Sequence, residues 1–494
     1  MKYNILWVCA DQLRADALGC NGDRFVDTPN IDRLAESGVN FTNAYCQNPT
    51  CTPSRASFLT GRYPRTCGCR QNGQPLPMDE ILVTKLLADN GYRCGLAGKL
   101  HIRPNHPAAA PSGEKRGDDG YSIFHNSGAG RKGWGSYEYR TWLKGRGVDY
   151  HVENYPGTVY VQYGMEILNH HTTWCFEKAR DFIEEATANK TPWLFSVNAY
   201  DPHHPFDPPK ELLDKYVNRL SELPLPNYVE GELDQKNIFQ KQDHESSYNS
   251  YATRPKLPYV SHGADSAAIG YDELTETEHR LLRAAYYAMI ELLDRQLGET
   301  LDLIDRLGQR ENTIVIFMAD HGELLGDHGI YLKGPHFYEP AVNVPLIMSC
   351  PGLIRDHVTS RALVELIDVA PTLCEAGEVG PQVQMQGRSL WKLLTGSGDA
   401  DRHRDGVYCE YYNSMPWHQT PKAYCTMRFD GRYKLVAVHS TDEYELYDLE
   451  RDPKETHNYW DDPDYGEIRI RQLQKLCDAM AYTADPMEER KVPW

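Results

Sequence analysis

Two almost wholly apolar runs, each followed at once by an acidic residue, restrict what this chain can fold into. Residues 3–10 (YNILWVCA) and 313–319 (TIVIFMA) are long enough for strands and carry apolar side chains on both alternating faces. Such a strand is buried on both sides, which is typical of a mostly parallel sheet covered by helices. Arg93–Ala97 and Trp193–Asn198 have the same character, and helical periodicity in Thr172–Ala188 separates two of these runs. The pattern predicts an α/β fold.

Polar side chains follow these expected strands where each one ends. Asp11 follows the first run, and Asp320 and His321 follow the second. A carboxylate just past the end of a central parallel strand lies where α/β sheets place their ligands. Two such carboxylates supply hard oxygen ligands for a divalent cation. The remaining polar residues in comparable positions are Gln12, Lys99, His101, His203 and Lys333.

The stretch at residues 51–62 (CTPSRASFLTGR) places a cysteine at the expected start of a helix. Pro53 is suited to the first turn, and Gly61 is a plausible C-terminal cap. Cys51 would then lie at the positive end of the helix dipole, with the charge of Arg55 one turn further on. Taken alone, such a cysteine is either a small buried residue or a thiolate nucleophile with a lowered pKa.

This stretch resembles the C-x-P-S-R signature of the type I sulfatases, in which the cysteine is oxidised after translation to formylglycine. The matching residues are Cys51, Pro53, Ser54, Arg55, Leu59, Thr60, Gly61 and Arg62. Further family elements are matched by Gly98–His101 (GKLH), Pro202–Phe206 (PHHPF), residues 320–334 (DHGE…G…KG) and Leu446–Pro453 (LYDLERDP). The resemblance covers nearly the whole chain. It implies the alkaline phosphatase-like α/β sandwich, in which these segments converge.

The resemblance also implies roles for individual residues. The implied catalytic residues are Cys51, Arg55, Lys99, His101, His203 and Lys333. The implied substrate-binding residues are Gln12, Asn72, Lys99, His203 and Lys333. The implied metal ligands are Asp11, Gln12, residue 51, Asp320 and His321. The oxygen ligands favour Ca²⁺. The chain departs from the family in Gln12, where relatives more often carry Asp, and His321 adds one imidazole. Mn²⁺ or another transition metal is therefore the alternative.

The expected function is hydrolysis of a sulfate ester, which makes the chain a sulfuric ester hydrolase. A phosphonate monoester or phosphodiester hydrolase with the same nucleophile is the alternative, because Gln12, Asn72 and His321 also suit those relatives. Lys99 and His101 favour sulfate. A third interpretation is a non-catalytic metal- or glycan-binding homologue with Cys51 left as a thiol, which the 32 Tyr and 9 Trp would suit.

Charge and composition narrow the expected partners. The net charge of -18 argues against nucleic acid and anionic membranes, while a local basic cluster could still bind an anionic small molecule or a saccharide sulfate. No apolar run is long enough to span a bilayer, and the N-terminus lacks the pattern of a signal peptide. We therefore expect a cytoplasmic protein, matured by a formylglycine-generating enzyme. Whether it forms a homo-oligomer stays open.

The pattern of the sequence changes near residue 396. From Val407 onward, short alternating segments and the hairpin signal Asp430-Gly431 predict a small antiparallel sheet. We expect a catalytic α/β domain at 1–395 and a C-terminal α+β subdomain at 396–494. Residues 103–160 and 207–274 show little periodicity, and we expect them to be long loops that shape the pocket.

Overall fold

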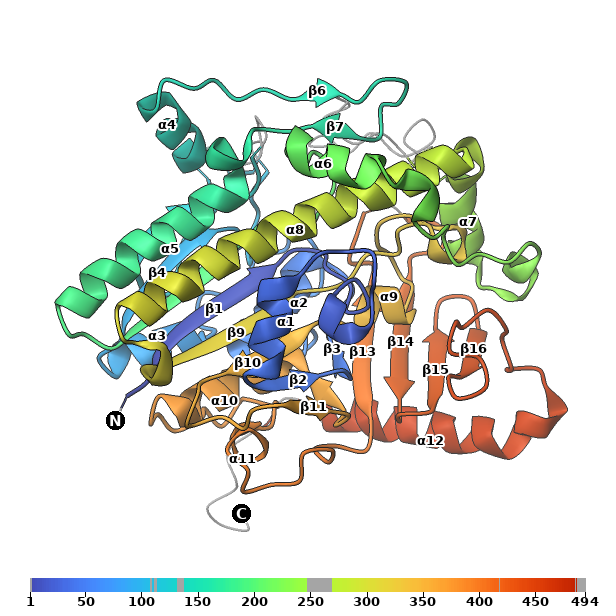
Figure 1. Cartoon of the computed structure of the whole chain (residues 1–494). Helices are drawn as coiled ribbons and strands as arrows, with labels where there is room; N and C mark the ends of the chain where they lie inside the picture. Colours follow the sequence, from blue (N-terminus) through green and yellow to red (C-terminus); the bar gives the residue numbers. More distant parts are fainter. Residues whose placement is uncertain are drawn as a thin grey trace, which may run out of the picture.

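The computed structural model describes residues 2–106, 109–110, 113–130, 137–246, 269–416, 418–484 and 486. Its centre is an eight-stranded mixed sheet with the order β11-β2-β10-β9-β1-β8-β4-β5 (Figure 1). The strands are β1 (Asn4–Ala10), β2 (Val39–Phe41), β4 (Arg93–Gly98), β5 (Tyr121–Asn126), β8 (Trp193–Asn198), β9 (Thr313–Ala319), β10 (Leu346–Ser349) and β11 (Val358–Ser360). The predicted α/β fold with a large, mostly parallel sheet is confirmed.

The two apolar runs are neighbours at the centre of this sheet. Strands β1 and β9 are parallel and in register from Asn4 opposite Thr313 to Ala10 opposite Ala319. Every residue of both strands is buried. On the other side of β1, strands β8, β4 and β5 continue the parallel part, whereas β10 runs antiparallel to β9. The carboxyl ends of the five parallel strands therefore share one edge.

Helices cover the sheet on both faces. The longest is α8 (Glu276–Arg306), whose N-terminus is fixed by a capping box between Thr275 and Glu278. It packs with α1 (Pro29–Glu36) and α5 (His171–Ala188) on one face, which Figure 1 shows in front of the sheet. The opposite layer contains α2 (Cys51–Thr60), α3 (Val83–Asp89) and α10 (Val369–Ala376). The central strands β1 and β9 are thus buried on both faces, as their sequences require.

The C-terminal region forms the expected small antiparallel sheet. Its strands, in the order β13-β14-β15-β16, are Val407–Tyr412, Tyr424–Phe429, Tyr433–Val438 and Glu443–Asp448. Helix α12 (Gly466–Tyr482) packs against β14 and β15. Ion pairs join this region to the rest of the chain, for example the buried Lys434 to Glu339 and Arg404 to the buried Glu365. The boundary at 395/396 stays a prediction.

Two segments expected to be long loops contain regular structure. Residues 103–160 supply the edge strand β5 and helix α4 (Tyr137–Gly145), and residues 207–274 supply α6 (Lys210–Val217) and α7 (Ile238–Ser246). The expectation was wrong here because short amphipathic elements that pack on a larger body carry little periodicity of their own. Parts of both segments lie outside the described residues. The remaining short elements are β3 (Ala44–Tyr45), β6 (Glu153–Asn154), β7 (Gln162–Tyr163), β12 (Val364–Glu365), α9 (Glu339–Val342) and α11 (Trp391–Leu394).

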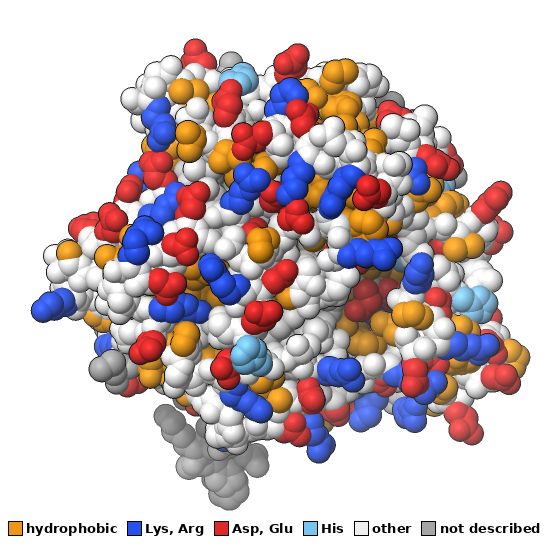
Figure 2. Space-filling model, viewed as in Figure 1, with side chains coloured by type: hydrophobic (Ala, Val, Ile, Leu, Met, Phe, Trp, Pro, Cys, Tyr) orange, Lys and Arg blue, Asp and Glu red, His pale blue; other side chains and the backbone are white. Residues whose placement is uncertain are grey.

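The surface in Figure 2 carries acidic and basic side chains intermixed over the visible face. No helix among the described residues is both long and apolar enough to cross a membrane. The side chains of Lys99 and Lys333, by contrast, are buried inside the molecule.

Candidate active site

The core of the site is built by the two central strands. Asp11 directly follows β1, and Asp320 and His321 directly follow β9. Because these strands are parallel neighbours, their ends bring both carboxylates together. The backbone reinforces this approach, since the N–H of Gln12 donates to Oδ1 of Asp320 over 3.1 Å. The side chains of Asp11, Gln12, Asp320 and His321 are completely buried.

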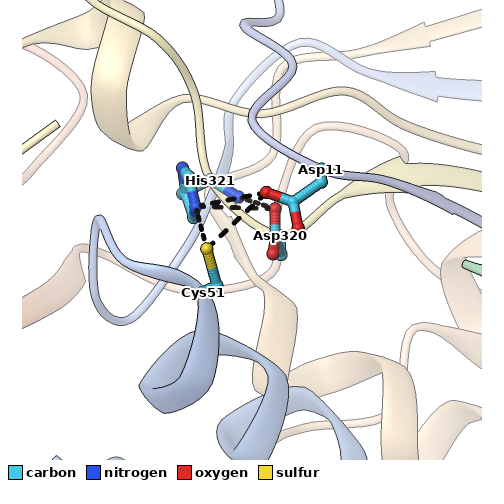
Figure 3. Close-up of side chains that lie close together, drawn as sticks. All are labelled: Asp11, Cys51, Asp320 and His321. Carbon is cyan, nitrogen blue, oxygen red and sulfur yellow. Dashed lines mark hydrogen bonds and ion pairs between the residues drawn. The ribbon is translucent and has the colours of Figure 1, made fainter. Parts of the chain in front are cut away.

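Cys51 completes this group from the opposite side, as the first residue of α2 (Figure 3). Its Sγ lies 3.1 Å from Nε2 of His321 and 3.6 Å from Oδ1 of Asp11. The ligand atoms of Asp11, Cys51, Asp320 and His321 all lie within 4.8 Å of one another. The helix ends at Thr60, and the next residue, Gly61, forms the predicted C-terminal cap with a left-handed φ of 70°.

Arg55 ties the two carboxylates to the helix that carries Cys51. Its Nε donates to Oδ2 of Asp320 over 2.8 Å, and its Nη2 lies 3.2 Å from Oδ2 of Asp11. The Nη1 donates to the backbone carbonyl of Lys99 over 2.8 Å. The guanidinium is fully buried, so these contacts are not weakened by water. Arg55 therefore fixes the relative positions of β1, β4, β9 and α2 at this edge.

Two lysines place positive charge around Cys51. Nζ of Lys333 lies 3.0 Å from Sγ of Cys51 and 3.2 Å from Nε2 of His321. Nζ of Lys99 lies 2.5 Å from Oδ2 of Asp11. Burial raises the pKa of the Cys51 thiol, but the charges of Lys333, Lys99 and His321 outweigh it and hold this pKa well below its ordinary value. The site therefore favours negative charge at residue 51.

The two histidines approach residue 51 from different strands. Nε2 of His203, which follows β8, lies 3.0 Å from Nζ of Lys333. Burial, followed by the charge of Lys333, lowers the pKa of His203 to about 4. His101, which follows β4, lies beside Thr52, with 3.3 Å between Nε2 and the hydroxyl oxygen. Burial and the charge of Lys99 lower the pKa of His101 as well.

Gln12 and Asn72 lie beside this group and contact it differently. The amide oxygen of Gln12 accepts from Nζ of Lys333 over 2.6 Å. The amide oxygen of Asn72 accepts from the backbone N–H of Thr52 over 2.9 Å and so caps the start of α2. The roles of both residues in binding metal or substrate stay predictions.

Two supporting carboxylates had no role in the sequence interpretation. Glu323 accepts from the amide nitrogen of Gln12 and from the backbone N–H of Leu325 over 2.8 Å. Glu114 accepts from the backbone N–H groups of His101 over 2.7 Å and of two following residues. Glu114 thereby holds the backbone at His101, which has a left-handed φ of 54°, whereas Glu323 contacts only the side chain of Gln12, whose φ is 64°. Left-handed conformations of residues other than glycine cost about 1–3 kcal/mol each. Glu323 belongs to a matched motif, whereas nothing in the sequence pointed to Glu114.

The donor set fits a divalent cation. Two carboxylates supply hard oxygen ligands and His321 supplies one imidazole nitrogen, with residue 51 facing them. A bound cation would offset the charge of two carboxylates buried side by side. This set of oxygen and nitrogen donors is compatible with more than one divalent metal.

Comparison with known proteins identifies the family. The family model described as sulfatase matches residues 3–379, and the one described as N-sulphoglucosamine sulphohydrolase, C-terminal, matches residues 326–481. This chain belongs to the sulfatase family and is a sulfuric ester hydrolase. Its fold is that of the alkaline phosphatase superfamily.

Three relatives illustrate the range of activities nearby. An arylsulfatase from Clostridium perfringens is 28% identical over 96% of this chain and 94% of its own length. An N-acetylglucosamine-6-O-sulfatase from Bacteroides thetaiotaomicron is 26% identical, covering 99% of this chain and 88% of its own. The solved structure of a phosphonate monoester hydrolase from Silicibacter pomeroyi is 25% identical, with a TM-score of 0.80 and coverage of 98% and 96%.

Proposed function

We propose that this protein hydrolyses a sulfate ester to an alcohol and inorganic sulfate, with formylglycine derived from Cys51 as the nucleophile. The observation that carries the proposal is the position of residue 51, at a helix start and within 3.6 Å of Asp11, His321 and Lys333. Formylglycine supplies a hydrated aldehyde, of which one hydroxyl can attack sulfur while the second allows sulfate to leave by elimination. A formylglycine-generating enzyme must act on the chain first.

The proposed metal ligands are Asp11, Asp320, His321, residue 51 and the amide oxygen of Gln12. We favour Ca²⁺, because oxygen ligands dominate the set, with Mn²⁺ or another transition metal as the alternative. When bound, the cation supplies positive charge that stabilises a deprotonated nucleophile and the sulfate oxygens. Arg55 keeps the two carboxylates in position for it.

The remaining residues bind sulfate and move protons. Lys99 and Lys333 offset the charge of the sulfate oxygens, and the amides of Gln12 and Asn72 add hydrogen bonds. His203 and Lys333 together supply the proton for the leaving alcohol oxygen. Because the pKa of His203 is about 4, its ring is neutral near pH 7, and the ammonium of Lys333 at 3.0 Å can provide this proton. His101 accepts a proton from the second hydroxyl at residue 51.

The alternative is a phosphonate monoester or phosphodiester as substrate. Gln12, Asn72 and His321 favour it, as does the likeness to a phosphonate monoester hydrolase. Lys99 and His101 favour sulfate, because they match the Lys-x-His pair of the sulfatase G-K-x-H element, which phosphonate monoester and phosphodiester hydrolases generally lack. For the alcohol half we propose a small molecule or a saccharide, since one relative is named for a sulfated N-acetylglucosamine.

Paired initial rates decide between these substrates. Peptide mass spectrometry first establishes formylglycine at position 51, and rates are then measured on 4-nitrophenyl sulfate and on a 4-nitrophenyl phosphonate monoester. We expect a higher kcat/KM on the sulfate. A clear preference for the phosphonate would show that Gln12, Asn72 and His321 are the better guide. An unmodified cysteine in protein from the native host, with no turnover, would support a non-catalytic metal- or glycan-binding role.

A further inference from the structure

Glu323 is a fully buried carboxylate that stands behind the site and contacts it through Gln12. Its Oε1 accepts from the backbone N–H groups of Leu325 over 2.8 Å and of Leu332 over 2.5 Å. Its Oε2 accepts from the amide nitrogen of Gln12. All three partners are N–H donors, so Glu323 acts here as an acceptor only, as a carboxylate does.

The contacts of Oε1 hold the loop that leads to Lys333. Leu325 and Leu332 have left-handed backbone conformations, with φ of 49° and 69°, which residues other than glycine seldom adopt. The backbone N–H of Leu324 donates to the carbonyl of Leu332 over 3.0 Å and closes the loop. Lys333 is the next residue in the chain. Oε1 of Glu323 therefore has a structural role, which is separate from the contact made by Oε2.

The amide of Gln12 lies between a group that can only donate and one that only accepts. Its oxygen accepts from Nζ of Lys333 over 2.6 Å, and an ammonium has no acceptor. Its nitrogen donates to Glu323 and lies 3.4 Å from Nδ1 of His204. Only one of the two orientations of the amide satisfies both Lys333 and Glu323. In that orientation the oxygen lies on the side of Lys333, which contacts residue 51.

The same contact explains why an amide suits position 12, where relatives more often carry Asp. A carboxylate at this position would face the carboxylate of Glu323 across a hydrogen-bond distance, inside the protein. Two like charges in such a place disfavour each other. The residue that position 12 tolerates therefore depends on the residue at position 323.

We propose that Glu323 is a positioning residue that keeps the amide oxygen of Gln12 directed toward Lys333 and the metal ligands. The inference rests on the proposed function, in which Gln12 is a ligand, and deepens it by naming the residue that orients this ligand. An amide binds a cation through its oxygen. A Gln12 amide turned the other way would present N–H groups to the cation and to Lys333.

Glu323→Gln separates the two sets of contacts. The amide oxygen of the new side chain can still accept from Leu325 and Leu332, which leaves its NH2 group opposite the NH2 group of Gln12. Turning the Gln12 amide removes this conflict but creates another with the ammonium of Lys333. The double variant Gln12→Glu/Glu323→Gln again pairs a donor with an acceptor, and it keeps the net charge of the wild-type protein.

Isothermal titration calorimetry of the metal-free proteins with Ca²⁺, and separately with Mn²⁺, measures the effect in the wild-type protein, both single variants and the double variant. Peptide mass spectrometry first establishes formylglycine at position 51 in each. We expect Glu323→Gln to raise the metal Kd by about 10–100-fold when residue 12 is glutamine. In the Gln12→Glu background the same substitution should lower the Kd or leave it unchanged, because it removes the repulsion between two carboxylates.

Asp294→Asn is the matched control. Asp294 is also buried, and it also accepts from two backbone N–H groups and one side-chain amide nitrogen, which belong to Asn30 and Ile31. The control therefore removes a buried charge with the same kinds of partner, but none of these partners is a proposed site residue. Its metal Kd should stay within about twofold of the wild-type value.

Three results would overturn the inference. The first is an unchanged metal Kd in Glu323→Gln. The second is a loss of equal size in both backgrounds, which would mean that Glu323 only supports the loop or only adds charge. The third is a wild-type protein that binds neither cation.

Folding and turnover are measured on the same preparations. If circular dichroism shows that Glu323→Gln does not fold alone, a folded double variant that binds metal would support the inference, whereas failure of both variants to fold would contradict it. The Kd values do not depend on turnover. Absence of 4-nitrophenyl sulfate hydrolysis by the wild-type protein would therefore count against the proposed function separately.

Discussion

The contacts of Arg55 make Arg55→Lys the sharpest test of how the site is held together. The guanidinium is fully buried and reaches Asp320, Asp11 and the carbonyl of Lys99 with three different nitrogen atoms. Lysine keeps the positive charge but has a single nitrogen on a flexible chain. It cannot reproduce a planar group that bridges two carboxylates. The substitution therefore removes the contacts that bridge the two carboxylates, while the net charge of the site stays the same.

The expected loss follows from the number of contacts. A hydrogen bond to a charged group contributes about 1.5–3 kcal/mol, and breaking a buried ion pair costs about 3–5 kcal/mol. If the ammonium keeps one carboxylate, Arg55→Lys should lower the free energy of unfolding by about 3 kcal/mol. Both carboxylates are proposed metal ligands, and the loss of an outer partner of a ligand weakens metal binding by about 10–100-fold.

Urea denaturation and metal titration measure the two effects. Arg33→Lys is the matched control, because Arg33 pairs with Asp302 at 3.7 Å and their side chains are 57% and 59% exposed. A surface pair contributes at most about 1 kcal/mol, so the control should behave as the wild-type protein. If Arg55→Lys unfolds and binds metal like the control, the bridging role of Arg55 is wrong.

Three further predictions concern other residues. Cys51→Ala should abolish hydrolysis of 4-nitrophenyl sulfate while circular dichroism shows an intact fold; a wild-type rate would refute the nucleophile assignment. Asp320→Ala should lose bound metal by elemental analysis, and unchanged metal content would remove Asp320 from the ligand set. Burial raises the pKa of the Glu114 carboxyl from 4.5 to about 7, so the folded state binds the carboxyl proton more tightly than the unfolded state does. The free energy of unfolding should therefore fall by about 3 kcal/mol as the pH rises from about 4.5 to about 7. Glu114→Gln should flatten that dependence, whereas parallel curves for the two proteins would show that Glu114 does not titrate there.

The sequence alone determined the main architecture and the ends of its strands. The runs that became β1 and β9 are apolar on both faces, so they had to lie inside a covered sheet. Asp11 and Asp320 come next in the chain, and parallel pairing of the two strands then brings them together. The helix that begins at Cys51 was equally predictable from the sequence, because Pro53 marks its first turn and Gly61 its end. These features depend only on residues that are close together in the chain, so they can be predicted from the sequence.

Tertiary structure alone decided which distant residues act on one another. Nothing in the spacing of Lys333 and His203 says that their nitrogen atoms are 3.0 Å apart, because the contact depends on how two loops fold over the sheet. Glu114 lies in a segment with weak periodicity, yet its carboxylate holds the backbone at His101. A small cavity lined by Tyr139, His171 and Tyr200 likewise exists only because α4, α5 and the loop after β8 pack together. Contacts between residues far apart in the chain follow from packing, which no local pattern encodes.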